Sequence, residues 1–224
     1  MSGFQSTRSV TTKAGVKVLG YGQSGAGKTL AIATAPAPVI LSAESGLLTL
    51  AKFDIPFIHI TSLEDLTKAY NLVTGSVGKN FQTICLDSIS EIAETCLAAE
   101  KRKTKDPRQA YTKSNDLIAG IIRSFRDIQG KNVYFTAKEE WNKDEQTGAM
   151  MFGPSMPGKQ LTKDIPYFFD VVLRFEIITD PATGAQSHWV RTVGDMNNVA
   201  KNRGGKLDKW EQPNLSNIFN KLAA

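Results

Sequence analysis

The sequence predicts an α/β fold in which a mainly parallel sheet is flanked by helices. Short apolar segments rich in β-branched residues recur along the chain, and amphipathic helical patterns lie between them. Such alternation is typical of parallel strands that are covered on both faces. In the last third of the chain two apolar segments, residues 171–178 and 188–193, flank the turn-rich TDPATGAQ. We therefore expect a C-terminal antiparallel hairpin that extends the sheet.

Each expected element follows from a local pattern. The expected buried strands are residues 16–21, 38–41, 57–60, 83–87 and 132–137. The clearest helix has an apolar face made of Leu117, Ile118, Ile121, Ile122, Phe125 and Ile128. A second helix is expected after Ser62, because Ser62 and Asp65 have the spacing of a capping box. A short helix is expected from about Asn214.

The composition is that of an ordinary folded protein. Apolar residues make up 41% of the chain and charged residues 22%, which excludes global disorder. No apolar run approaches the roughly 18 residues that cross a bilayer, and the polar N-terminus lacks a secretory signal. We expect a single domain over residues 15–224 after a flexible tail of residues 1–14, without membrane contact. The expected location is the cytoplasm, or the host cytoplasm if the protein is phage-encoded.

The cysteines and histidines carry no predicted chemistry. Cys85 and Cys96 fall in a strand pattern and a helix pattern without a CxxC or a histidine cluster, so we expect buried, reduced thiols. His59, on a strand, and His188, in the hairpin, are assigned structural roles. The net charge of +5 is compatible with a polyanionic partner but does not require one.

A glycine-rich segment joins the first expected strand to a helix that begins near Lys28. Residues 22–29 spell G-x-x-x-x-G-K-T, the phosphate-binding P-loop. Its glycines let successive backbone N–H groups turn toward the β- and γ-phosphates of a nucleotide, and Lys28 adds a full positive charge. Thr29 offers a hydroxyl to Mg²⁺. The expected cofactors are ATP and Mg²⁺, and the expected nucleotide ligands are Gly22, Gln23, Ser24, Gly25, Ala26, Gly27, Lys28 and Thr29.

Two acidic residues follow expected strands. Asp87 ends TICLD, and we expect it to orient Mg²⁺ as a Walker B residue; the alternative is a cap of the following helix. Glu44 follows the strand after the P-loop helix and is expected to orient the attacking water. Because the carboxyl ends of neighbouring parallel strands share one edge of a sheet, Glu44 is expected on the ligand side. A solvated loop position is the alternative for Glu44.

The P-loop, ILSAES on the next strand and ICLDS as Walker B together resemble the core of the RecA recombinase family, above all phage-encoded RecA-like ATPases that anneal single strands. The resemblance covers about residues 15–205. It implies a RecA-like P-loop NTPase core that hydrolyses ATP and acts on single-stranded DNA in annealing, recombination and repair. It also implies a homo-oligomer, ring or filament, and makes a single-strand binding protein a candidate partner. The chain departs from the family at Thr136, Ala137 and Lys138, where the family has a polar Asn-Gln pair linking the nucleotide and DNA sites.

Two segments predict contacts with DNA. Residues 100–111 form a basic patch between two helices, which would bind phosphates without regard to DNA sequence; a solvated basic loop is the alternative. Its basic residues are Lys101, Arg102, Lys103, Lys105 and Arg108. Residues 138–166 show no strand or helix signal, and long structureless loops are often functional. The residues expected to stack on bases or to follow phosphates there are Trp141, Lys143, Met151, Phe152, Lys159 and Lys163.

The segment Lys201-Asn202-Arg203 resembles the K-N-K of the RecA family, which reaches the γ-phosphate of a neighbouring subunit. The resemblance implies that Lys201 and Arg203 stabilise transition-state charge in trans. An exposed basic turn is the alternative. Two other functions stay open, a P-loop small-molecule kinase with residues 138–166 as its lid and a nucleotide-switched assembly protein that does not bind DNA.

Overall fold

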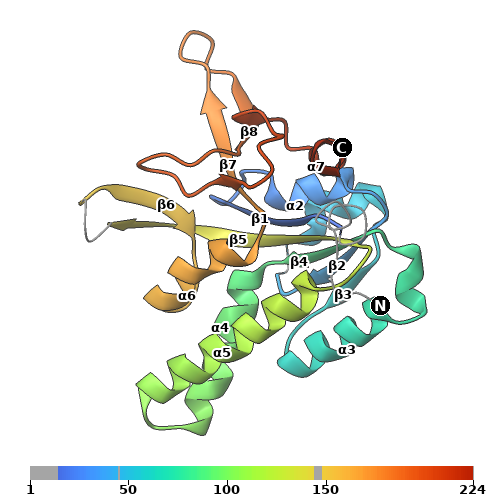
Figure 1. Cartoon of the computed structure of the whole chain (residues 1–224), viewed down its shortest axis with the longest axis vertical. Helices are drawn as coiled ribbons and strands as arrows, with labels where there is room; N and C mark the ends of the chain where they lie inside the picture. Colours follow the sequence, from blue (N-terminus) through green and yellow to red (C-terminus); the bar gives the residue numbers. More distant parts are fainter. Residues whose placement is uncertain (1–14, 45, 144–147, 224) are drawn as a thin grey trace, which may run out of the picture.

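A computed structural model describes residues 15–44, 46–143 and 148–223, and its centre is a mixed sheet with helices on both faces (Figure 1). The strands are β1 (Lys17–Gly22), β2 (Pro38–Ser42), β3 (Phe57–His59), β4 (Thr83–Asp87), β5 (Asn132–Lys143), β6 (Met150–Pro154), β7 (Val171–Thr179), β8 (Gln186–Arg191), β9 (Lys201–Asn202) and β10 (Trp210–Glu211). The α-helices are α2 (Lys28–Ala31), α3 (Leu63–Thr74), α4 (Ile89–Lys103), α5 (Pro107–Arg126), α6 (Lys159–Asp164) and α7 (Leu215–Ala223). The expected tail of residues 1–14 lies outside the described residues.

The sheet is parallel at its centre and antiparallel at one side. Its order is β10-β8-β7-β1-β5-β4-β2-β3, and the strands from β7 to β3 run parallel. β8 pairs antiparallel with β7, β10 with β8, β9 with β7 and β6 with β5. Every residue of β1 and of β4 is buried, as expected for strands covered on both faces. The predicted mainly parallel α/β fold is confirmed, and the five predicted strands begin within one residue of β1 to β5.

Two apolar clusters cover the two faces of the sheet. One cluster joins Leu66 of α3, Ile92 of α4 and Ile122 of α5 to one face. The other joins Ala31 of α2 and Ile218 of α7 to the opposite face. The two layers of helices therefore bury both sides of the central strands, and ligands can reach the sheet only at the ends of its strands.

Helix signals were largely correct. Ser62 caps α3 by accepting the Asp65 N–H at 3.1 Å, and the Asp65 carboxylate in turn accepts the Thr61 N–H at 3.1 Å. In α5, Ile118 and Phe125 are buried as predicted, but Leu117 is exposed because it lies at the edge of the apolar stripe. Within the described residues no helix is both long and apolar enough to cross a membrane.

The prediction of a structureless loop over residues 138–166 is wrong. β5 continues to Lys143, β6 pairs with this extension, and α6 follows. The segment KEEWNK gave no strand signal because the end of β5 projects beyond the sheet, where residues 141–143 are exposed and no apolar face is needed (Figure 1). The paired segments β5 and β6 are called the β5–β6 hairpin below.

The basic patch at residues 100–111 is also less of a loop than expected. Lys101, Arg102 and Lys103 form the last turn of α4, and Arg108 lies in the first turn of α5. Basic side chains in the last turn of a helix complement its dipole, which explains why α4 extends through them. Asp106 begins α5 by accepting the Arg108 N–H at 2.9 Å. Only residues 104–106 connect the two helices.

Candidate functional site

The glycine-rich segment forms a turn between the central strand β1 and helix α2. Gly22 ends β1 so close to β7 that a Cβ there would lie 2.5 Å from the Phe175 carbonyl oxygen. Gly27 has a φ of +97° directly before α2, a backbone conformation that other residues rarely adopt. The structure therefore contains the turn that the motif predicts. This turn lies at the carboxyl end of a parallel strand, where ligands of such sheets bind.

Lys28 lies across the mouth of this turn. Its Nζ donates to the carbonyl oxygens of Gly22 at 2.7 Å and of Gln23 at 2.8 Å. Burial lowers the pKa of Lys28, while the carboxylates of Glu44, Asp87 and Glu139 act in the opposite direction. A partly desolvated ammonium surrounded by backbone dipoles is suited to a polyanionic ligand.

Asp87, the last residue of β4, faces the P-loop. It is only 2% exposed and accepts the Thr29 hydroxyl, with 3.0 Å to one carboxylate oxygen and 3.2 Å to the other, as well as the Thr136 hydroxyl. Burial raises the pKa of Asp87, and the Glu44 carboxylate raises it further. Ser88 caps α4 by accepting the Glu91 N–H, so the alternative that Asp87 is the helix cap is wrong.

The oxygens of Thr29 and Asp87 fit a magnesium ion. Mg²⁺ prefers hard oxygen ligands and usually combines one or two protein oxygens with phosphate oxygens and water. The direct contact between this hydroxyl and this carboxylate places both ligand types at one point. In the described part of the chain no group of three or more His, Cys, Asp and Glu side chains could hold a metal.

Glu44 lies just beyond β2, which is the neighbour of β4 in the sheet. Its Oε1 accepts the Ser88 hydroxyl, and its backbone carbonyl accepts the Ser42 hydroxyl at 2.7 Å. It also acts electrostatically on Lys28 and Asp87. Glu44 is therefore held at the phosphate end of the site, which argues against a role as a mere solvated loop residue.

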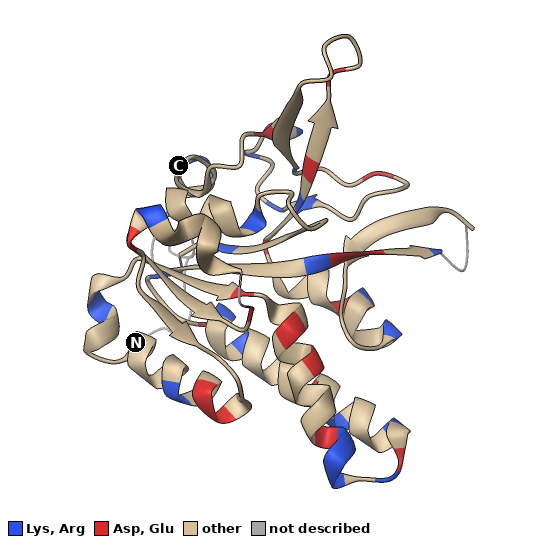
Figure 2. Ribbon diagram, turned by 180° about the vertical axis from the view of Figure 1, so that it is seen from behind, with Lys and Arg blue, Asp and Glu red and all other residues tan. Residues whose placement is uncertain are grey.

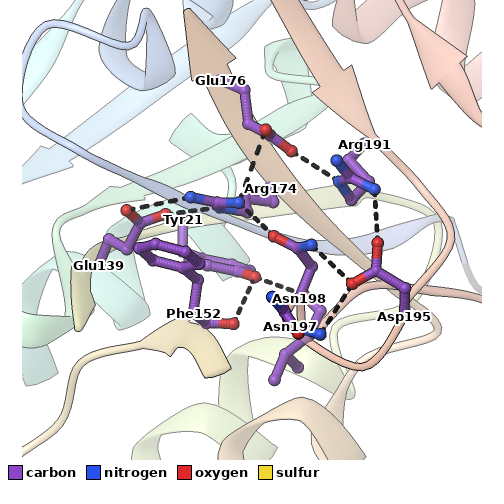
Figure 3. A network of polar contacts seen from close by, with 10 residues as sticks. Tyr21, Glu139, Phe152, Arg174, Glu176, Arg191, Asp195, Asn197 and Asn198 are labelled. Carbon is purple, nitrogen blue, oxygen red and sulfur yellow. Dashed lines mark hydrogen bonds and ion pairs between the residues drawn. The ribbon is translucent and has the colours of Figure 1, made fainter. Parts of the chain in front are cut away.

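A second polar cluster lies at the base of the β5–β6 hairpin (Figure 3). Arg174 of β7 pairs with Glu139 of β5 at 2.8 Å, donates to Asn198 and lies 3.5 Å from Glu176. Its guanidinium also lies 3.9 Å from the ring centroid of Phe152 in β6. Because the side chain of Arg174 is only 10% exposed and that of Glu139 only 5%, this ion pair is a buried one.

The main chain of Phe152 is tied to the sheet as well. Its N–H donates to the Asn197 carbonyl at 2.8 Å, and its carbonyl accepts the Tyr21 hydroxyl at 3.0 Å and the Val199 N–H at 2.9 Å. Burial raises the pKa of Tyr21, so the hydroxyl stays a donor. These bonds connect the strand that leads into the P-loop with the β5–β6 hairpin.

The predicted DNA ligands of residues 138–166 have different environments. Trp141 is 59% exposed and stacks on Phe152, with ring centroids 5.6 Å apart and an angle of 5° between the planes. Phe152 is partly buried and contacts both the Trp141 ring and the Arg174 guanidinium, and its stacking on bases stays a prediction. Lys143 lies at the exposed end of β5, and Met151 lies on β6.

The remaining basic residues predicted to bind DNA lie on α6, at the ends of α4 and α5, and, in the case of Lys105, in the connection between these two helices (Figure 2). Lys159 and Lys163 are on α6 and exposed. The Lys101 ammonium lies 5.1 Å from the ring centroid of Tyr111. A Cβ on Gly158, directly before α6, would lie 3.3 Å from the same Tyr111. Tyr111 thus lies in contact with both the end of α4 and the start of α6. A surface hollow of about 360 Å³ lies nearby, between α4 and residues 155–157.

Lys201 and Arg203 lie away from this chain's own P-loop. Lys201 of β9 pairs with Val172 of β7, whereas Gly22, where the P-loop begins, pairs with β7 three residues further along. The Lys201 Nζ donates to the Pro166 carbonyl at 2.7 Å. Arg203 pairs with Asp170 at 2.6 Å.

Three residues of the site were missed by sequence reasoning. Thr136 donates to Asp87, Ser88 donates to Glu44, and the Tyr134 hydroxyl donates to the Lys28 carbonyl at 3.2 Å. A usable signal was present for Thr136, because a polar residue within a buried strand needs a partner. Cys85 and Cys96 are free and buried, as predicted.

Comparison with known proteins agrees with the motif. A family model described as an AAA domain matches residues 14–204, which include the P-loop, Glu44, Asp87 and the β5–β6 hairpin. Among curated proteins, none matches the chain.

Proposed function

Because the chain belongs to the AAA domain family of P-loop nucleotide-binding proteins, we propose that it is an ATPase of the RecA-like recombinase type that acts on single-stranded DNA in annealing and recombination. Family membership accounts for nucleotide binding and ATPase activity. The proposal adds the nature of the substrate and the use of Mg²⁺.

In the proposed reaction the P-loop and Lys28 hold the phosphates of ATP, and Thr29 and Asp87 hold magnesium. When bound, the ion would neutralise charge on the β- and γ-phosphates. Glu44 orients the attacking water through its other carboxylate oxygen, while its Oε1 is held by Ser88. Hydrolysis forms the bond from this water to the γ-phosphorus and breaks the bond to the β-phosphate oxygen.

The observation that favours DNA is the exposed indole of Trp141 on a hairpin anchored to the P-loop strand. Base stacking on an aromatic face stabilises single-strand complexes by about 1–3 kcal/mol per base. Lys143 and the lysines of α6 supply cations for the phosphates near this face. The anchored main chain of Phe152 favours this role over that of a kinase lid, which must open and close.

The test is the anisotropy of a labelled single-stranded oligonucleotide, measured with and without ATP and Mg²⁺ over a salt series. We expect tight binding that weakens steeply with salt, and a loss of about 5- to 150-fold in Trp141→Ala. Phe57→Ala is the matched control, because Phe57 is 58% exposed on the edge strand β3. Equal affinities of the Trp141→Ala and wild-type proteins would remove Trp141 from the interface, and the absence of DNA binding would favour a kinase or an assembly switch.

We further propose that the protein works as a homo-oligomer in which Lys201 and Arg203 contact ATP bound to a neighbouring chain. Their position away from the P-loop of the same chain supports this arrangement. Sedimentation velocity with and without ATP tests it, since ATP is then expected to promote assembly. An Arg203→Ala protein that assembles but hydrolyses ATP normally would contradict the trans role of that residue.

A further inference from the structure

His188 of β8 contacts the P-loop from the side of the β7–β8 pair. It lies opposite Ile177 of β7, and its Nδ1 is 3.2 Å from the Ala26 carbonyl oxygen. A carbonyl oxygen only accepts hydrogen bonds, so Nδ1 must carry the proton and donate. Ala26 is therefore fixed by two contacts. Its carbonyl binds His188, and its side chain, which is 1% exposed, packs in an apolar cluster.

This contact determines which way the peptide between Ala26 and Gly27 points. In a planar trans peptide the C=O and N–H groups point in opposite directions. Because the Ala26 carbonyl points toward His188, the Gly27 N–H points away from His188. Within the described residues this N–H donates to no other group.

Without the hydrogen bond to His188, the Ala26–Gly27 peptide would be free to rotate. Gly25 and Gly27 have φ values of +80° and +97°, and glycines change conformation at little steric cost. A Cβ on Gly27 would lie 3.5 Å from His188 Nδ1, so the imidazole packs directly beside this residue.

We propose that His188 is a positioning residue of the nucleotide site, which holds the Ala26–Gly27 peptide so that the Gly27 N–H donates to a bound phosphate. The inference rests on the nucleotide binding described above. It differs from the expectation that both histidines are only structural, and it assigns the β7–β8 pair a part in phosphate recognition.

The test compares the binding of ATP with Mg²⁺ by calorimetry in wild-type protein, His188→Ala and His188→Asn. The Asn amide can place a donor near the position of Nδ1, whereas Ala cannot. We expect binding that is about 2- to 12-fold weaker in His188→Ala, from the loss of one hydrogen bond, and restored to within about two-fold in His188→Asn. His59→Ala is the matched control, because His59 is an exposed histidine on the edge strand β3, which pairs with β2 and not with β1 or β8, and the change should leave the affinity for ATP as it is.

A second measurement reports on the peptide itself. In ¹⁵N-labelled wild-type protein, ATP is expected to shift the Gly27 amide signal strongly, and this shift should shrink in His188→Ala while the shift of the Thr29 amide is kept. Unchanged affinity and an unchanged Gly27 shift in His188→Ala would overturn the inference alone. Failure of wild-type protein to bind ATP would overturn both the inference and the proposed function.

Discussion

Replacing Arg174 with Met should destabilise the protein far more than replacing an exposed arginine. The Arg174 side chain is 10% exposed and that of its partner Glu139 is 5% exposed, so Arg174→Met leaves a buried carboxylate without its cation. Removing one member of a buried pair costs about 3–5 kcal/mol. For a chain of this size that corresponds to a fall in melting temperature of roughly 6–20 °C.

The assay is urea unfolding followed by tryptophan fluorescence, supported by thermal melts. Arg203→Met is the matched control, because Arg203 and Asp170 also form a close ion pair, at 2.6 Å, but with side chains 62% and 50% exposed. Exposed pairs contribute about 0–1 kcal/mol, so this variant should stay near wild type.

A double-mutant cycle separates the ion pair from the packing of Arg174 on Phe152. The double variant Arg174→Met/Glu139→Gln should lose less free energy of unfolding than the two single variants lose together, by at least about 2 kcal/mol. The reason is that the double variant leaves no buried charge unpaired. Additive losses, or a loss below about 1 kcal/mol in Arg174→Met, would refute the reasoning that the buried charge dominates.

Three further predictions concern the nucleotide site and the base of the sheet. Lys28→Ala should abolish ATP binding in calorimetry, and retained binding would contradict the assigned role. Glu44→Gln should bind ATP normally but lose at least about 100-fold in turnover, as expected when a group that orients water is removed; unchanged turnover in a phosphate-release assay would exclude Glu44 from the mechanism. Lys17, whose Nζ donates to the Ile128 and Lys131 carbonyls, has a pKa lowered by burial to about 8, against 10.5 for the unfolded chain. Because the unfolded state binds more protons between these values, the free energy of unfolding should rise by about 3 kcal/mol as the pH rises from about 8 to 10.5, and Lys17→Met should flatten this rise in urea titrations.

Part of the site could be predicted because its signals are local. The residues from Gly22 to Thr29 are contiguous, so their turn and its phosphate chemistry can be recognised without knowing the rest of the fold. Asp87 and Glu44 were found because Asp87 ends one buried apolar strand and Glu44 lies two residues after another, and parallel strands present their carboxyl ends at one edge.

The β5–β6 hairpin could not be predicted in this way. Strand signals depend on alternating burial of apolar residues, whereas in the outer part of β5 the buried side chain is the charged Glu139 and residues 141–143 are exposed. Its structure depends on pairing with β6 and on the contact of Phe152 with Arg174, a residue 22 positions further along the chain.

The sequence by itself therefore determined the parallel α/β sheet, the P-loop and its acidic partners, because periodicity and contiguous motifs carry that information. Only the tertiary structure decided that Thr136 binds Asp87, that Arg174 anchors the β5–β6 hairpin and that His188 reaches Ala26. The last contact joins residues 162 positions apart. Such contacts arise where strands distant in the sequence become neighbours in the sheet, and no local pattern records which side chains will meet there.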